Sequence, residues 1–179
     1  MIAAVVAVDE NWGIGRNNEL LVHIPEDLKN FKKLTTGGIV VMGRKTYDSL
    51  PKKPLPNRTN IVITSNLETG KMIRQEEVNG ETVFYAKLDL LKFALPFYVE
   101  DSKDDIFIIG GGMIYKELLP FCDKIYMTKI HHAYNNVDTY FPNIDKMPEW
   151  KLEMSSDIRK HNDIEYQFCI YKKQKEDNT

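Results

Sequence analysis

The sequence is poor in cysteine, which limits the disulfide and metal chemistry open to it. It contains two cysteines, Cys122 and Cys169, whose spacing matches no metal-binding motif. A disulfide between them is one alternative, although two reduced thiols in the core of an intracellular protein are the favoured interpretation. The four histidines fit no metal motif either, and we assign them no role.

The sequence also lacks the features of exported, membrane-spanning or nucleic-acid-binding proteins. No segment contains the ~20 apolar residues that a membrane-spanning helix needs. The first residues, MIAAVVAVDENWG, lack the basic start and long apolar run of a signal peptide and are typical of a buried strand. The net charge of −2 creates no basic field for nucleic acid or an anionic membrane. We therefore expect a cytoplasmic protein with neither kind of partner.

The composition is that of one ordinary globular domain. The chain has 179 residues, of which 42% are apolar and 28% charged, which is enough for a single domain with its own core. It contains no internal repeat and no low-complexity tract. We predict one domain over residues 1–172 and a polar C-terminal tail over residues 173–179.

Apolar runs typical of buried strands alternate with segments of helical spacing, which predicts an α/β fold. Its sheet should be mainly parallel, with an antiparallel C-terminal edge and about four flanking helices. Residues 68–82 are long enough to form an extra hairpin. The strands are predicted over residues 2–8, 38–43, 59–64, 81–86, 105–112 (ending in a glycine turn), 124–132, 150–156 and 164–172, and the helices over residues 25–35, 44–50, 88–97 and 113–121.

One acidic residue lies on the apolar face of the first predicted helix. In HIPEDLKNFKKLT (23–35), Leu28 and Phe31 recur at helical spacing, and Asp27 falls on their face. Negative charge in the first turn favours any helix start, which is the simpler alternative. Glu26 already supplies that charge on the outer face, however. Because a buried acid is costly unless it is paired, Asp27 needs a further explanation.

Residues that suit phosphate groups occur where predicted strands end. The three glycines 110–112 expose backbone N–H groups between a buried strand and a helix, at the strand end where open α/β sheets bind ligands. Arg44 and Lys45 combine a planar fork with a point charge at a second junction. The simpler alternatives are a tight glycine turn and a solvated basic turn. Thr64 and Ser65 end the next strand, where a polar strand end is at least as good an explanation.

Three further features are ambiguous when each is taken alone. Arg58 closes a proline-rich loop and is suited to clamp a carboxylate, although an ordinary surface arginine is the preferred alternative. Thr128 lies among apolar strand residues, where its hydroxyl needs a partner if it is buried, but threonine is common in strands. Residues 9–24, which contain a G-x-G with no helix after it, are predicted to form a mobile loop.

Seven motifs, taken in order, resemble the dihydrofolate reductase family. They are AVDENWGIGRNNEL, IPEDLKNFKKLT, VVMGRKTYDSL, PLPNRTNIVIT, IIGGGMIY, IYMTKI and VDTYFP. The match runs from residue 2 to about residue 142, and the closing strands fit too. It implies the single-domain dihydrofolate reductase fold and NADPH-dependent reduction of 7,8-dihydrofolate to 5,6,7,8-tetrahydrofolate. It also implies that antifolate inhibitors bind and that the enzyme is a monomer.

The resemblance implies a role for Asp27. In this family an acid on the first helix accepts hydrogen bonds from the N3 and 2-amino groups of the pterin, two adjacent donors that suit a carboxylate. Thr128 would support Asp27 from across the sheet, and Leu20 and Val22 would complete the catalytic set. Arg58 would grip the α-carboxylate of the glutamate tail. The other implied substrate-binding residues are Val5, Val6, Leu28, Phe31, Lys32, Leu50, Lys53, Leu55, Ile109 and Tyr115.

The resemblance implies NADPH as the cofactor and no metal. The glycines would carry its pyrophosphate turn, with an unusual cis peptide bond that we place at Gly111–Gly112. Positive charge around Arg44 would favour the 2′-phosphate, and therefore NADPH over NADH. The implied cofactor-binding residues are Ala7, Ile14, Gly15, Arg16, Asn17, Asn18, Glu19, Leu20, Gly43, Arg44, Lys45, Thr46, Ile63, Thr64, Ser65, Lys87, Ile109, Gly110, Gly111, Gly112, Met113, Ile114 and Tyr115.

The sequence departs from the family pattern in the loop before the first helix. Most relatives have Pro-Trp where this chain has Leu21–Val22, and Val22 cannot donate the hydrogen bond that helps to order water near the substrate. Two alternatives stay open. One is a reductase of the same fold that acts on a pyrimidine intermediate of riboflavin synthesis, which the set of Asp27, Phe31 and Arg58 disfavours. The other is a non-enzymatic nucleotide-binding module, which needs no pairing of Asp27 with Thr128.

Overall fold

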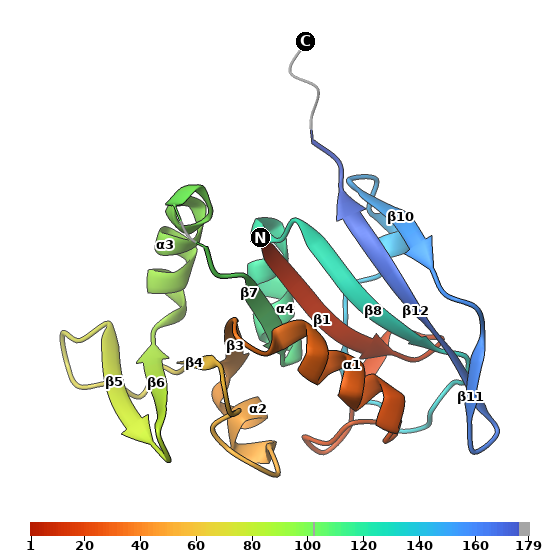
Figure 1. Ribbon diagram of the computed structural model, residues 1–179, viewed down its shortest axis with the longest axis horizontal. Helices are drawn as coiled ribbons and strands as arrows, with labels where there is room; N and C mark the ends of the chain where they lie inside the picture. Colours follow the sequence, from red (N-terminus) through yellow and green to blue (C-terminus); the bar gives the residue numbers. More distant parts are fainter. Residues whose placement is uncertain (102, 176–179) are drawn as a thin grey trace.

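The structure is a computed structural model that describes residues 1–101 and 103–175. Figure 1 shows one twisted sheet whose strands run in the order β10-β12-β8-β1-β7-β3-β4-β6-β5, with β11 paired to β12. Its strands are β1 (Ile2–Val8), β3 (Ile39–Gly43), β4 (Thr59–Ile63), β5 (Ile73–Val78), β6 (Glu81–Ala86), β7 (Ile106–Gly110), β8 (Lys124–Ile130), β10 (Trp150–Ser155), β11 (Arg159–His161) and β12 (Ile164–Lys173).

The sheet is parallel in the middle and antiparallel at both edges. β8, β1, β7, β3, β4 and β6 are mutually parallel neighbours. β12 and β10 close one edge in antiparallel pairing, and β5 closes the other. The predicted α/β class with antiparallel C-terminal strands is therefore confirmed. The central strands are continuously apolar because both of their faces are covered.

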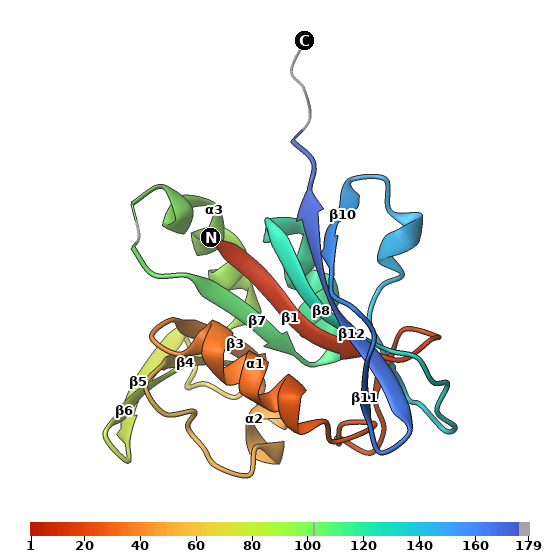
Figure 2. The same ribbon diagram turned by 45° about the vertical axis from the view of Figure 1, so that its right-hand side comes forward.

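Helices cover both faces of the sheet. α3 (Leu88–Asp101) and α4 (Gly112–Leu118) pack against one face, and α2 (Arg44–Ser49) packs against the other. α1 (Pro25–Thr35) lies on the same side as α2, as Figure 2 shows. Two short 3-10 turns, η1 (Leu119–Phe121) and η2 (Ile144–Lys146), and a small second sheet of β2 (Gly13–Gly15) and β9 (Thr139–Tyr140) complete the described elements.

The third helix is longer than predicted. The expected end near Pro96 is wrong, because α3 continues to Asp101. Leu91 and Leu95 are buried, and Tyr98 packs against the same cluster three residues further on. An apolar stripe that continues past the proline outweighs the cost of one lost backbone hydrogen bond.

The extra hairpin predicted within residues 68–82 is present, but it extends further along the chain. β5 pairs with β6 from Val78↔Glu81 to Ile73↔Ala86. The turn residues Asn79 and Gly80 both have positive φ, 51° and 81°, as a tight two-residue hairpin turn requires. β5 is the outermost strand at this edge of the sheet.

The remaining sequence predictions concern the cysteines, the loop and the ends of the chain. Cys122 and Cys169 are both buried free thiols, so the disulfide alternative is excluded. Residues 9–24 contain β2, which pairs with β9, and the mobility expected for this loop stays a prediction. β12 includes Lys173, the first residue of the predicted tail, and residues 176–179 lie outside the described residues. No helix in the described part of the chain is both long and apolar enough to span a membrane.

Candidate active site

The carboxyl ends of the parallel strands form one edge of the sheet. In the strand register, Gly43 at the end of β3 lies opposite Ile63 at the end of β4, which lies opposite Ala86 at the end of β6. On the other side of β3, Met42 lies opposite Gly110 at the end of β7. Ligand sites of open α/β sheets occur at such an edge. It collects the glycine turn and the basic junction, which are far apart in the sequence.

Asp27 and Thr128 form a hydrogen-bonded pair between α1 and β8. Thr128 Oγ1 donates to Asp27 Oδ1 at 2.5 Å, and Thr128 is only 4% exposed. Ile24, which precedes α1 and is 3% exposed, anchors this end of the helix in the core. Asp27 therefore faces the sheet instead of solvent, which answers the question raised by the sequence. In the described part of the chain, its Oδ2 atom accepts no hydrogen bond.

The surroundings of Asp27 disfavour its ionised form. Burial raises the pKa of the Asp27 carboxyl above its ordinary value of 3.8, and the hydrogen bond from Thr128 opposes part of that increase. The hydrogen bond from Thr128 fixes the Oδ1 atom of Asp27, and this also fixes the direction in which Oδ2 points. The carboxylate is suited to receive a pair of adjacent N–H donors from a flat ring.

Tyr115 of α4 connects the glycine turn to β1. Its hydroxyl donates to the carbonyl oxygen of Val5 at 2.6 Å, and its ring packs edge-on against Phe141 at 5.0 Å. Burial, followed by the charge of Asp27, raises the pKa of Tyr115 far above its ordinary value. Tyr115 is therefore a neutral wall of the site within electrostatic reach of Asp27. Ala7 lies directly opposite Thr128 in the register of β1 and β8, which brings it to the same region.

Apolar side chains line the sheet near Asp27. Phe31 of α1 is half-buried, and Leu28 is 45% exposed although it lies on the apolar face of an amphipathic helix. A second group, partly buried against the core on the α2 side, consists of Val5, Leu50, Leu55 and Ile109. These residues are suited to enclose a flat heterocycle. Val6 does not share this face: it packs in the cluster on the α4 side, because successive strand residues alternate.

Arg58 is held as a fixed fork beside Phe31. It is 7% exposed, its Nε atom donates to Pro56 O at 2.9 Å, and its Nη1 atom donates to Thr35 Oγ1 at 2.9 Å. Its Cζ atom lies 6.0 Å from the centre of the Phe31 ring. Burial lowers the pKa of the Arg58 guanidinium, and the charge of Glu81 opposes that shift. A buried cation with fixed orientation is suited to a carboxylate ligand.

The two lysines expected to bind substrate, Lys32 and Lys53, lie in different surroundings. Lys32 is exposed on α1 near Phe31 in the sequence. The Nζ atom of Lys53 donates to the carbonyl oxygen of Asp48 at 2.8 Å and lies 5.9 Å from the centre of the Tyr47 ring. The structure thus directs Lys53 towards α2, and its expected contact with the substrate stays a prediction.

The glycine turn packs closely against the α2 junction. A Cβ atom on Gly111 would lie 3.4 Å from Thr46 Oγ1, and one on Gly43 would lie 3.2 Å from the Ile114 side chain. Gly112 has the least room, because its Cβ atom would lie 2.7 Å from Thr139 Cγ2. The cis peptide bond is Gly110–Gly111, so its expected place at Gly111–Gly112 is wrong by one residue. Gly112 is instead the first residue of α4.

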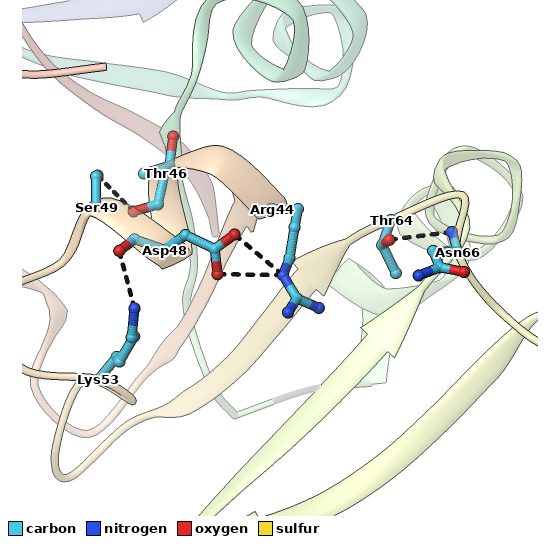
Figure 3. A network of polar contacts seen from close by, with 7 residues as sticks. All are labelled: Arg44, Thr46, Asp48, Ser49, Lys53, Thr64 and Asn66. Carbon is cyan, nitrogen blue, oxygen red and sulfur yellow. Dashed lines mark hydrogen bonds and ion pairs between the residues drawn. The ribbon is translucent and has the colours of Figure 1, made fainter. Parts of the chain in front are cut away.

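The basic junction carries a small polar network, which Figure 3 shows. Arg44 Nε contacts both carboxylate oxygens of Asp48, at 3.2 and 3.3 Å. Thr64 Oγ1 accepts the backbone N–H of Asn66 at 3.1 Å, which shapes the turn after β4. Lys45 and Ser65 are exposed near this network. Together these groups provide cations and hydroxyls at one end of the sheet edge.

The other expected cofactor residues differ in what they expose. Met113 is 65% exposed, whereas Ile63 and Ile114 are buried, which leaves them only backbone atoms for contact with a ligand. Lys87 is partly buried, and its backbone N–H donates to Met72 O at 3.0 Å. Ile14 is partly buried against the core in β2.

The loop before α1 is fastened to the loop that contains β9. Arg16 and Glu19 exchange two backbone hydrogen bonds of 3.1 and 2.9 Å. Asn17 and Asn18 between them have positive φ, 50° and 60°. The Asn17 N–H donates to Asp138 Oδ2 at 2.8 Å, and a Cβ atom on Gly15 would lie 3.0 Å from the Glu19 carbonyl.

The residues around the Leu21–Val22 substitution divide between solvent and core. Leu20 is 52% exposed and Leu21 is 8% exposed. Val22 packs against the same small cluster as Ala7. The structure thus brings Val22, Ala7 and Thr128 to one region, while Leu20 faces outward.

Sequence reasoning missed four residues that the structure joins to this site. They are Thr35, Asp138, Tyr85 and Arg74. Thr35 orients Arg58, and Asp138 holds the loop at Asn17. The ring of Tyr85 contacts the guanidinium groups of both Arg44 and Arg74. All four act through contacts between distant segments, so local spacing carries no signal for them. Asp138 was visible only as part of the motif VDTYFP.

The donor set fits a phosphorylated dinucleotide. The glycine turn packs tightly against its protein neighbours at Gly111 and Gly112, and glycine at such a strand-to-helix junction leaves backbone N–H groups open to a phosphate. Arg44 and Lys45 supply positive charge near this turn. In the described residues, no group of three or more potential ligands is arranged to hold a metal ion.

Comparisons with known proteins agree with this geometry. The family model for dihydrofolate reductase matches residues 1–173. The dihydrofolate reductase of Bacillus subtilis is 39% identical over 175 residues, covering 97% of this chain and 95% of that protein. The dihydrofolate reductase of Buchnera aphidicola from Acyrthosiphon pisum is 36% identical, covering 94% and 97%. A structure of Enterococcus faecalis dihydrofolate reductase, complexed with NADP(H) and RAB-propyl, has a TM-score of 0.77 at 32% identity and covers 98% and 97%.

The fold, the edge site and these matches place the protein among the nicotinamide-dependent oxidoreductases of the α/β class. Within that class, the chain belongs to the dihydrofolate reductase family. The resemblance stated from the sequence is confirmed.

Proposed function

We propose that 7,8-dihydrofolate binds beside Asp27 and that NADPH binds along the glycine turn. The reaction is the NADPH-dependent reduction of dihydrofolate to tetrahydrofolate. Bound NADPH supplies the hydride, which passes from nicotinamide C4 to pterin C6, and the protein aligns the two rings. The observation that carries the proposal is the Asp27–Thr128 pair, whose 2.5 Å hydrogen bond holds a carboxylate at the ligand edge of the sheet.

Asp27 recognises the pterin and favours its protonated form. Its carboxylate accepts hydrogen bonds from the N3 and 2-amino groups of the ring, with Thr128 fixing the orientation. The N5 atom, which gains a proton, lies across the ring from these groups. Asp27 therefore acts through its charge, and water delivers the proton. Partial burial strengthens this effect, because solvent screens the carboxylate less.

The two ends of the proposed site recognise different anions. The buried fork of Arg58, oriented by Thr35, binds the α-carboxylate of the glutamate tail. Phe31 and Leu28 contact the rings between Arg58 and Asp27. At the other end, Arg44, Lys45 and the hydroxyls after β4 bind the adenosine phosphates of NADPH, and their positive charge favours NADPH over NADH.

Val22 changes how water is ordered near the substrate. The side chain packs with Ala7 in an apolar cluster and has no donor for a hydrogen bond. Proton delivery in this chain therefore depends on groups other than residue 22.

Antifolate inhibitors bind at the same Asp27–Thr128 pair. They donate a hydrogen bond to the Oδ2 atom of Asp27, which Thr128 leaves free. The monomeric state and cytoplasmic location stay predictions.

One assay tests the proposal. Purified protein is mixed with NADPH and 7,8-dihydrofolate, and the loss of NADPH absorbance is followed. The expected result is loss of absorbance that needs both compounds and is nearly abolished in Asp27→Ala, while NADPH still binds that variant. Full turnover in Asp27→Ala, or no turnover in the unaltered protein, would contradict the proposal. The riboflavin-type alternative predicts turnover only with a pyrimidine substrate.

A further inference from the structure

Two arginines from different elements lie against one buried tyrosine ring. The Cζ atom of Arg44 in α2 is 5.4 Å from the centre of the Tyr85 ring, and the Cζ atom of Arg74 in β5 is 4.6 Å from it. Tyr85 is 5% exposed and packs edge-on against Tyr47 at 6.3 Å. The ring is therefore a fixed support for both guanidinium groups, and such cation–π contacts limit where each group can lie.

Arg74 reaches this place through the register of the hairpin. Antiparallel pairing sets Arg74 opposite Tyr85, and parallel pairing sets Tyr85 opposite Val62 in β4. Residues directly opposite one another share a face of the sheet. Thr64 lies two residues after Val62, so the Arg74 side chain lies close to the strand end that carries the expected phosphate ligands.

Both arginines have one acidic partner and a free end. Arg44 Nε is 3.2 Å from Asp48 Oδ1, and Arg74 Nε is 3.3 Å from Glu76 Oε1. The two arginine side chains are 48% and 46% exposed. Within the described ranges, the terminal nitrogens of neither guanidinium donate a hydrogen bond to the protein. Each fork can therefore bind a second anion without breaking its present contact.

We propose that Arg74 is a second arginine for the 2′-phosphate of NADPH, acting beside Arg44. The inference rests on the proposed function, because it takes NADPH as the cofactor. Arg74 binds through its terminal nitrogens, and Tyr85 holds it in position before the cofactor arrives. The hairpin of β5 and β6 is thus a specificity element that favours NADPH over NADH.

The test compares the affinities of NADPH and NADH in Arg74→Gln. We expect the dissociation constant for NADPH, measured by calorimetry, to rise about tenfold, since a hydrogen bond to a charged group is lost. The constant for NADH, which lacks the 2′-phosphate, should stay within about twofold. The KM for NADPH should rise in parallel while kcat is unchanged, and Arg74→Lys should recover part of the affinity.

A matched control is available on the far edge of the sheet. Arg159 also lies over an aromatic ring, 5.2 Å from the centre of Phe168, and is paired with Asp157 at 3.8 Å. Arg159→Gln removes the same charge and the same kind of contact, so it should leave both affinities unchanged. An equal effect of Arg159→Gln and Arg74→Gln on NADPH affinity would assign the loss to net charge and overturn the inference.

The remaining outcomes also decide the matter. Equal losses for NADPH and NADH in Arg74→Gln would mean that Arg74 acts only by supporting the hairpin, and no loss would mean that it does not meet the phosphate. Either result overturns the inference and leaves the proposed function intact. Failure of the unaltered protein to reduce dihydrofolate would instead contradict the proposed function, and the ratio of NADPH to NADH affinity would still test Arg74.

Discussion

Thr128 of β8 donates its hydroxyl hydrogen to the carboxylate of Asp27 in α1, across 101 residues of chain. Neither residue is explained by its own element, since α1 needs no acid on its inner face and β8 needs no hydroxyl in its core. The proposed function explains the pair as a preformed acceptor for the pterin. Its charge and its hydrogen bond can each be removed separately, which gives two distinct predictions.

Removal of the Asp27 carboxylate should move the pH profile of hydride transfer to lower pH. Burial raises the pKa of the Asp27 carboxyl above its ordinary value. With substrate bound, Asp27 and the pterin should therefore keep a shared proton to a higher pH than an ordinary carboxyl would. Hydride transfer should slow as pH rises and that proton is lost. In Asp27→Ser the substrate must be protonated without that charge. We expect the rate at neutral pH to fall about 10²–10³-fold and to recover as pH falls. Stopped-flow measurement across pH tests this, and an unchanged midpoint would contradict it.

Removal of the Thr128 hydroxyl should move that midpoint in the opposite direction. The hydrogen bond from Thr128 lowers the pKa of Asp27, so Thr128→Val raises it further. The KM for dihydrofolate should rise about tenfold, since a hydrogen bond to a charged group is lost. Thr82→Val is the control, because Thr82 makes a comparable 2.8 Å hydrogen bond to Glu77 on the outer hairpin. A midpoint equal to that of the unaltered enzyme would refute the role given to Thr128.

Replacement of the Arg58 fork should weaken binding of the glutamate tail alone. Arg58→Lys keeps the charge but loses the paired N–H groups that Thr35 and Pro56 orient. We expect the KM for dihydrofolate to rise about 10–100-fold. Dihydropteroate, which lacks the glutamate, should show no change. Equal effects on both substrates in steady-state assays would place Arg58 outside the carboxylate site.

Release of Asp138 should expose the loop before α1 to trypsin. The N–H of Asn17 is the main cause of the lowered pKa of Asp138, so this contact persists at neutral pH and is lost only as the carboxylate is protonated in acid. In Asp138→Ala, cleavage after Arg16 should become several-fold faster. The matched variant Asp157→Ala should leave it unchanged. Faster cleavage at all basic residues would indicate general destabilisation instead.

The sequence predicted most of the sheet because its strands are continuous apolar runs with glycine, proline or polar residues between them. α1 was correctly bounded at residues 25–35 because Pro25 suits a helix start and the apolar spacing continues to its end. Pro96 misled the prediction of α3, since packing against the core outweighed a local signal. Local patterns are decisive only where tertiary contacts agree with them.

The site was predicted less evenly. Single residues with unusual neighbours, such as Asp27, could be noticed from the helix pattern, whereas their partners were reached only through the resemblance. The surroundings of Lys53 could not be predicted, because a flexible lysine in a loop is positioned by whichever carbonyl it meets, here that of Asp48. Arg74 lies in a segment with an ordinary charged composition, and only the register of β5 against β6 reveals its neighbour Tyr85.

Because β5 lies at the margin of the sheet, coenzyme preference and pterin recognition depend on separate parts of the fold. The only sheet neighbour of β5 is β6, in the order given by the described strands, so β5 can change length or charge without moving Asp27 or Thr128. Preference for one dinucleotide can thus drift during evolution, or be engineered, while recognition of the pterin stays as it is. Insertions in this segment are the natural place to look for altered coenzyme choice among related chains.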